Sequence, residues 1–219
     1  MYSLNHLDIR GYRQEPLPHT FFQQDEESQH AVMVFAGRGV NCQHPTLYYP
    51  TLELLQRGAD VLLVDYCLRP GFSTFSDEEI TGCVATDTIA AYQALFRHRS
   101  YQHVTLIGKS LGTAAMGYLL TTVSSMPQVQ VIWLTPLLHR PELRAQIRQV
   151  HPLSLFIIGT EDFCYDASEL AELEEVTKGA TLVIKGAGHP LEVPDGTIAS
   201  LHVMEQIMQA IQTFLDHEK

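Results

Sequence analysis

Short hydrophobic runs alternate with longer amphipathic segments along most of the chain. The runs contain four to six residues, are rich in β-branched side chains, and lie at 31–35, 61–65, 104–108, 129–134, 153–158 and 181–184. Their hydrophobic residues are nearly continuous, which is typical of strands covered on both faces. The pattern therefore predicts a mostly parallel central β-sheet with helices on both faces.

Six further segments have the spacing of helices. They lie at 44–57, 77–98, 111–123, 140–149, 167–177 and 197–216. Before residue 30 the sequence predicts one or two antiparallel edge strands, near 3–10 and 16–23. Regular alternation of strands and helices indicates an α/β fold with right-handed crossovers. Functional sites in such folds form at the carboxyl ends of the strands.

Composition narrows the class of protein. The 219 residues contain no internal repeat or linker-like tract, so we expect one α/β domain over 1–219. A formal net charge of −11 disfavours nucleic acid and anionic membranes as partners. The first residues lack the apolar segment of a secretory signal, and no run approaches the roughly 20 apolar residues of a membrane span. These features predict a cytoplasmic protein.

Cysteine and histidine spacing gives no sign of a metal or other cofactor. Cys42, Cys67, Cys83 and Cys164 form no CxxC pair, and we expect free, mostly buried thiols. The 11 histidines include no HExxH spacing. We therefore expect no metal site and no cofactor.

The strongest chemical motif follows the strand at 104–108. Residues 108–112 read Gly-Lys-Ser-Leu-Gly, the G-x-S-x-G pattern of a nucleophile elbow, and a small-residue helix begins directly afterwards. A sharp strand-to-helix turn places Ser110 at a helix N-terminus, which favours negative charge. The motif predicts Ser110 as a nucleophile, whereas Lys109 is interpreted as a solvent-facing or packing residue.

A serine nucleophile needs a base and an acid that orients the base. Asp162 follows the strand at 153–158, and His189 follows the strand at 181–184. The chain order Ser110, Asp162, His189 matches the order known for nucleophile-elbow enzymes. We predict His189 as the base and Asp162 as the acid, with Glu161 and Asp166 as alternatives for the acid.

Acyl transfer also needs hydrogen-bond donors for the oxyanion. The backbone N–H of Leu111 is the first candidate. The glycine-containing loop at 36–41 supplies the second, with the Arg38 amide preferred and Gly37 in reserve. The Arg38 side chain has two interpretations, a surface charge or a group that recognises an acidic substrate.

Together these motifs resemble the α/β-hydrolase superfamily, and in particular its small members without a lid, such as dienelactone-hydrolase-like proteins and short bacterial carboxylesterases. The resemblance extends from AGRGVN (36–41) through VLLVDY, GKSLG and IGTED to GAGH. It implies the α/β-hydrolase fold and a catalytic triad. Many relatives have a histidine where this chain has Ala36, and dienelactone hydrolases are expected to use cysteine where this chain has Ser110.

Many members of this superfamily insert a lid after the strand that corresponds to 129–134. Here 18 residues, 135–152, connect that strand to the next, which is room for one short helix. We therefore expect no lid domain and an open, shallow site suited to small or exposed acyl groups. Leu137, Leu138, Phe163 and Tyr165 are candidates for its apolar wall, with ordinary packing as the alternative.

The sequence thus predicts a serine hydrolase, of the carboxylesterase or thioesterase type, that cleaves a small carboxylic ester or thioester through an acyl-enzyme on Ser110. The alternative is a non-catalytic protein of the same fold that binds a ligand in the same cleft. The sequence does not choose between ester, thioester, lactone and amide. It also leaves the oligomeric state undecided, with a homodimer open.

Overall fold

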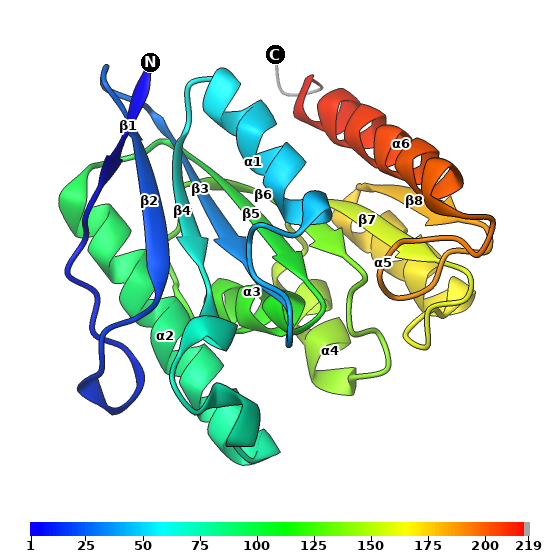
Figure 1. Cartoon of the computed structure of the whole chain (residues 1–219), viewed down its shortest axis with the longest axis horizontal. Coiled ribbons are helices and arrows are strands. Elements are labelled where there is room, and N and C mark those ends of the chain that lie inside the picture. The colour runs from blue at the N-terminus through cyan, green and yellow to red at the C-terminus, as the bar shows by residue number, and fades with distance from the viewer. Residues whose placement is uncertain (217–219) are drawn as a thin grey trace.

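The computed structural model describes residues 1–216 and is built on an eight-stranded sheet of order β1-β2-β4-β3-β5-β6-β7-β8 (Figure 1). The strands are β1 (Tyr2–Asn5), β2 (His19–Gln24), β3 (His30–Phe35), β4 (Asp60–Val64), β5 (His103–Lys109), β6 (Gln128–Leu134), β7 (Leu153–Gly159) and β8 (Ala180–Ile184). Strands β3 to β8 pair in parallel, whereas β2 is antiparallel to both β1 and β4. The parallel strands therefore end at one common edge.

Helices cover both faces of the sheet (Figure 1). One face carries α1 (Pro45–Gln56) and α6 (Thr197–Asp216), and the other carries α2 (Asp77–His98), α3 (Leu111–Thr122), α4 (Pro141–Val150) and α5 (Ala167–Thr177). The core accordingly has two parts, with Val32 and Val34 of β3 on the α1/α6 side and Met33 and Phe35 on the other. Burial on both faces explains the continuous hydrophobic runs of β3 to β7, whereas the edge strand β8 is largely exposed or half-buried. Each of the six predicted strands and six predicted helices is confirmed to within one residue at each end.

The N-terminal segment differs from the prediction. The first strand ends at Asn5 rather than at residue 10, although Leu7 and Ile9 alternate as strand residues would. These two side chains, 5% and 3% exposed, instead pack into the core on the α2 side. Arg13 and Gln14 then have positive φ (56° and 60°), which breaks any extended backbone. Strand β2 lies inside the sheet because β1 pairs along its outer side.

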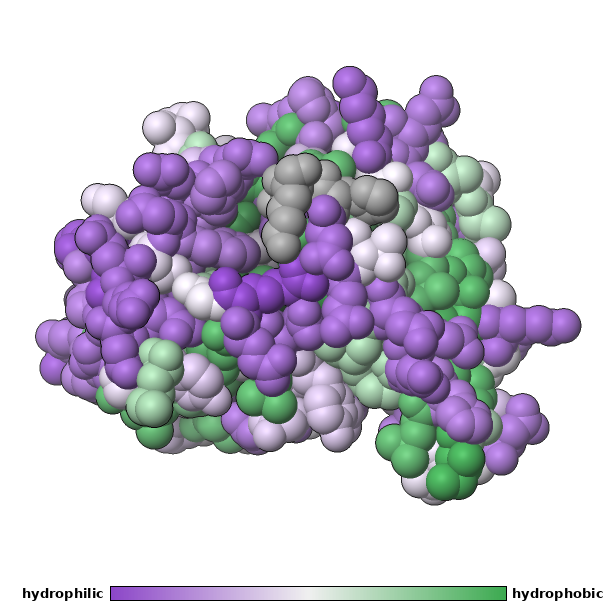
Figure 2. All heavy atoms as spheres, turned by 90° about the horizontal axis from the view of Figure 1, so that it is seen from above, coloured by the Kyte–Doolittle hydropathy of each residue, from purple (hydrophilic) through white to green (hydrophobic). Residues whose placement is uncertain are grey.

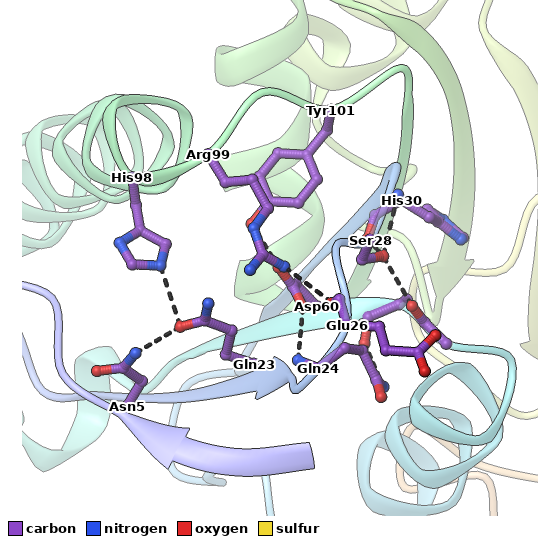
Figure 3. A network of polar contacts seen from close by, with 12 residues as sticks. Asn5, Gln23, Gln24, Glu26, Ser28, His30, Asp60, His98, Arg99 and Tyr101 are labelled. Carbon is purple, nitrogen blue, oxygen red and sulfur yellow. Dashed lines mark hydrogen bonds and ion pairs between the residues drawn. The ribbon is translucent and has the colours of Figure 1, made fainter. Parts of the chain in front are cut away.

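A buried carboxylate ties β2 to the rest of the sheet at the opposite edge from the strands' carboxyl ends (Figure 3). Asp60 is fully buried and accepts hydrogen bonds from Gln24 N (2.7 Å), Tyr101 Oη (2.8 Å) and Arg99 Nη1 (2.9 Å). Its partners come from β2 and from the connection between α2 and β5. Asp60 therefore satisfies three donors that would otherwise be buried or half-buried without an acceptor.

We expect Asp60→Asn to lower the free energy of unfolding by about 3 kcal/mol, because a buried ion pair broken on one side leaves its partner uncompensated. Urea unfolding of the variant against wild type measures the change. Asp25→Asn, on the exposed turn after β2, is the matched control and should stay within about 0.5 kcal/mol of wild type. Equal stability of the two variants would contradict a stabilising role for Asp60.

The surface is mainly polar on the face seen from above, where hydrophobic residues occur in small separate groups (Figure 2). Within residues 1–216, no helix combines the length and the hydrophobicity that a membrane span requires.

Candidate active site

The three residues predicted as nucleophile, base and acid meet at the carboxyl edge of the sheet. Ser110 follows β5, Asp162 follows β7 and His189 follows β8. His189 Nε2 lies 2.8 Å from Ser110 Oγ, and His189 Nδ1 lies 2.9 and 3.0 Å from the two oxygens of Asp162. The contacts fit an imidazole that donates from Nδ1 to the carboxylate and accepts the serine hydroxyl proton at Nε2. This is the geometry in which a histidine can deprotonate a serine.

The backbone of Ser110 adopts φ 51° and ψ −112°, a conformation that costs a non-glycine residue of order 1–3 kcal/mol. Local bonds hold it there: Ser110 N donates to Leu134 O (3.0 Å), and Thr113 donates to Ser110 O from both N (2.9 Å) and Oγ1 (2.6 Å). The turn also depends on close backbone approach. A Cβ at Gly108 would lie 2.7 Å from Gly112 backbone atoms, and one at Gly112 would lie 2.2 Å from Phe35 O.

Asp162 is the carboxylate that is hydrogen-bonded to His189. Its side chain is fully buried and also accepts a hydrogen bond from Cys164 N (2.8 Å). Burial raises the pKa of this carboxyl, but the hydrogen bonds from His189 and Cys164 N outweigh it and hold the pKa below its usual range. Asp162 is therefore ionised at neutral pH and able to stabilise a protonated imidazole.

Glu161 and Asp166, the two alternatives for the acid, make other contacts. Asp166 caps the N-terminus of α5 and accepts from Ser168 N (3.0 Å) and Glu169 N (3.1 Å). Glu161 is exposed and contacts the hydroxyl of Thr160. The structure thus brings Asp162, rather than either neighbour, to His189.

The predicted oxyanion donors lie on both sides of Ser110. Leu111 is the first residue of α3, so its N–H has no acceptor within the helix. Gly37 is buried against Ser110, since a Cβ there would lie 3.5 Å from Ser110 Cβ and 3.2 Å from Lys109 O. Arg38 is exposed, and its guanidinium lies 3.3 Å from the exposed carboxylate of Asp77, which favours the interpretation of its side chain as a surface charge.

The Gly37–Arg38 loop is anchored by two residues that sequence reasoning missed. The buried carboxylate of Asp65, just after β4, accepts from Cys42 N (2.6 Å). The Cys67 thiol donates to Val40 O (3.1 Å). The sequence contained one indication of the role of Asp65, which is its position directly after a buried strand. A carboxylate at such a position needs hydrogen-bond donors from a neighbouring loop.

Lys109 is buried, which favours the packing interpretation of its side chain over the solvent-facing one. It is 3% exposed, and its Nζ donates to His189 O (2.8 Å) and Thr135 Oγ1 (3.2 Å). Burial lowers its pKa to about 8, although Asp162 and Glu192 act in the opposite direction. The Lys109 ammonium next to Ser110 therefore holds the backbone of His189.

Because Lys109 is buried, we expect the free energy of unfolding of wild type, relative to a variant without this lysine, to rise at alkaline pH. A lysine with a folded pKa of about 8 and an ordinary pKa of 10.5 loses its proton in the folded state first, so between these values the unfolded state binds more protons. The free energy of unfolding of wild type relative to Lys109→Met should rise by about 3 kcal/mol from pH 7 to above pH 10.5.

Urea unfolding of wild type and Lys109→Met at pH 7, 8, 9 and 10 measures most of this rise in the difference between their free energies of unfolding. Lys185→Met, which removes an exposed lysine, is the matched control. A pH-independent difference for Lys109→Met would show that Lys109 titrates normally.

Of the four predicted wall residues, Phe163 lies against His189. The exposed ring of Phe163 is 4.7 Å from the ring of His189. Leu137 and Leu138 are 5% and 0% exposed in the core, so their assignment to an open wall is wrong and the packing alternative holds. Tyr165 is partly buried and packs on the same core. A positive φ at Thr135 (46°) turns the chain after β6 and precedes the two buried leucines.

Leu111, the residue after Ser110, also lines a cavity. A cavity of about 460 Å³ opens beside Leu111 between α2, α3 and α4. Between β6 and β7, α4 is the one helix among the described residues, so the connection carries no lid.

A group of potential metal ligands coincides with the candidate triad. Donor atoms of Asp162, Cys164 and His189 lie within 4.8 Å of one another. Asp162 and His189 are already bonded to each other, and burial raises the pKa of the Cys164 thiol to about 12. The donor set therefore fits hydrogen bonding better than metal ligation, which needs a thiolate.

Comparison with known proteins identifies the fold. No protein-family model and no curated protein matches the sequence. Among solved structures, an esterase from Pyrococcus furiosus superposes with a TM-score of 0.66 at 16% identity, over 97% of this chain and 91% of that chain. Dienelactone hydrolase from Anabaena variabilis gives 0.67 at 18% identity, over 97% and 98%.

A third structure, esterase 2 from Thermogutta terrifontis phosphorylated by paraoxon, gives a TM-score of 0.64 at 16% identity, over 94% of this chain and 91% of that chain. Each match extends over nearly the full length of both chains, and the strand order and the strand-to-helix turn at Ser110 agree with it. The chain therefore has the α/β-hydrolase fold.

Proposed function

We propose that this protein is a serine hydrolase that cleaves a carboxylic ester or thioester of a small molecule through an acyl-enzyme on Ser110. The observation that carries the proposal is the hydrogen-bonded series Ser110–His189–Asp162 at the carboxyl edge of the sheet. The strained backbone of Ser110 adds support, because such strain persists where function requires it. The esterases and the dienelactone hydrolase of the same fold agree with this class.

In the proposed mechanism, Ser110 Oγ attacks the carbonyl carbon while His189 Nε2 takes the hydroxyl proton. Asp162 holds the imidazole and stabilises its positive charge. The tetrahedral oxyanion accepts hydrogen bonds from Leu111 N–H and from the amide of Arg38 or Gly37. His189 then protonates the leaving alcohol or thiol, and the same steps with water as nucleophile release the acid.

An active-site-directed fluorophosphonate, followed by peptide mass spectrometry, tests the nucleophile. The proposal expects phosphonylation of Ser110 together with hydrolysis of p-nitrophenyl or thioester substrates. An unlabelled, folded sample would contradict it and favour the non-catalytic alternative, in which the cleft only binds a ligand.

A further inference from the structure

The cavity that Leu111 lines follows one face of α3. Leu111, Ala114 and Tyr118 line it at spacings of three and four residues, so they lie in one row along the helix. The row begins at the residue next to the nucleophile. From Leu111 to Tyr118 the helix rises roughly 10 Å. The cavity therefore extends along the axis of α3 from the residue that follows Ser110.

The cavity walls opposite the α3 row are partly apolar. Val84 and Ala85 of α2 and Leu143 of α4 face the α3 row across it. Polar residues also line it: Thr81, His139, Arg140 and Glu142, all exposed, and the half-buried Gln146. Arg140 and Glu142 carry opposite charges, so the cavity selects neither a cation nor an anion.

Close packing of α3 and α4 gives the cavity its shape. Gln146 lies over Gly117, where a Cβ would come within 2.3 Å of Gln146 Oε1. The volume of about 460 Å³ falls within the range of small-molecule sites. It is larger than an acetyl group needs.

We propose that this cavity binds an uncharged, unbranched apolar chain of the substrate, about eight carbons long over the roughly 10 Å of α3 that lines it. The inference rests on the proposed function, since it places the scissile carbonyl at Ser110. The protein is then a hydrolase of medium-chain esters or thioesters rather than of acetyl or charged acyl groups. Each methylene that enters the cavity should raise kcat/KM about fourfold until the cavity is filled.

Two substrate series distinguish which side of the ester enters the cavity. The acyl arm uses p-nitrophenyl esters from acetate to dodecanoate, and the alcohol arm uses acetates of ethanol to octanol followed by pH-stat titration. We expect kcat/KM to rise with chain length to a maximum near eight carbons in one arm. A value that is highest at the shortest chain in both arms would overturn the proposal.

Narrowing the cavity should remove this dependence. Ala114→Phe fills the α3 wall, and we expect it to lower kcat/KM at least tenfold more for the best chain length than for the shortest. Ala145→Phe makes the same change at an exposed position of α4 outside the cavity, and should keep the wild-type profile. Ala85→Leu narrows the opposite wall and replaces Ala114→Phe if that variant does not fold. Profiles parallel to wild type in the folded cavity variants would contradict the assignment.

A binding measurement separates this inference from the proposed function. Calorimetric titration of Ser110→Ala with methyl hexanoate needs no turnover. We expect binding that is at least tenfold weaker when Ala114→Phe is added. Absence of binding to Ser110→Ala would overturn the cavity assignment even if fluorophosphonate labels wild type. Binding without labelling of wild type would instead support the cavity and contradict the hydrolase.

Discussion

Ser110→Ala should lower kcat for the best ester substrate by about 10⁴-fold or more, because no other group takes over the covalent step. In the structure the Ser110 hydroxyl lies 2.8 Å from His189 Nε2, already placed to lose its proton. Single-turnover assays and fluorophosphonate labelling measure the loss. A variant that retains more than a small fraction of activity would contradict Ser110 as nucleophile.

Stability separates loss of chemistry from loss of fold. Alanine has the same backbone preferences as serine at φ 51°, so Ser110→Ala should unfold at nearly the wild-type urea concentration. Ser110→Gly removes the steric cost of this conformation and should raise the free energy of unfolding by about 1 kcal/mol. Both variants should be inactive. A less stable glycine variant would show that the backbone of Ser110 is not strained.

Asp162→Asn should lower kcat by about 10⁴-fold with little effect on KM. The asparagine amide would donate a hydrogen bond to His189 Nδ1, which forces the imidazole proton onto Nε2. A protonated Nε2 cannot accept the proton of Ser110, although the distances are preserved. Steady-state kinetics across pH measure the loss of kcat, and a crystal structure of the variant checks that the distances are preserved.

The neighbouring acids provide the controls. Glu161→Gln changes an exposed carboxylate, and Asp166→Asn keeps a residue type that caps helices well. We expect kcat of both variants to stay near the wild-type value. A large loss in Glu161→Gln together with an active Asp162→Asn would move the acid to Glu161.

The strained backbone of Ser110 and the buried side chain of Lys109 belong to the same turn between β5 and α3. The positive φ of Ser110 and the lowered pKa of Lys109 both cost folding free energy. Lys109 in return holds the carbonyl of His189, and the elbow presents Ser110 to the same histidine. Stabilising substitutions at these two positions should therefore reduce activity.

The sequence by itself determined the layered architecture and the proposed chemical groups. Strands buried on both faces must be continuously hydrophobic, so their limits could be located to within one residue. The motif around Ser110 and the strand ends before Asp162 and His189 share an edge because parallel strands end together. Local sequence patterns are sufficient to predict these features, because each depends only on where strands and helices follow one another along the chain.

Only the tertiary structure decided features that depend on packing between distant segments. Leu7 and Ile9 alternate like strand residues but are buried by α2, and Leu137 and Leu138 enter the core rather than an open wall. Lys109 continues a buried strand, yet its partners are 26 and 80 residues away along the chain. The cavity has no sequence pattern of its own, because it is the space left where α2, α3 and α4 meet, and its volume depends on helix separations that no single segment specifies.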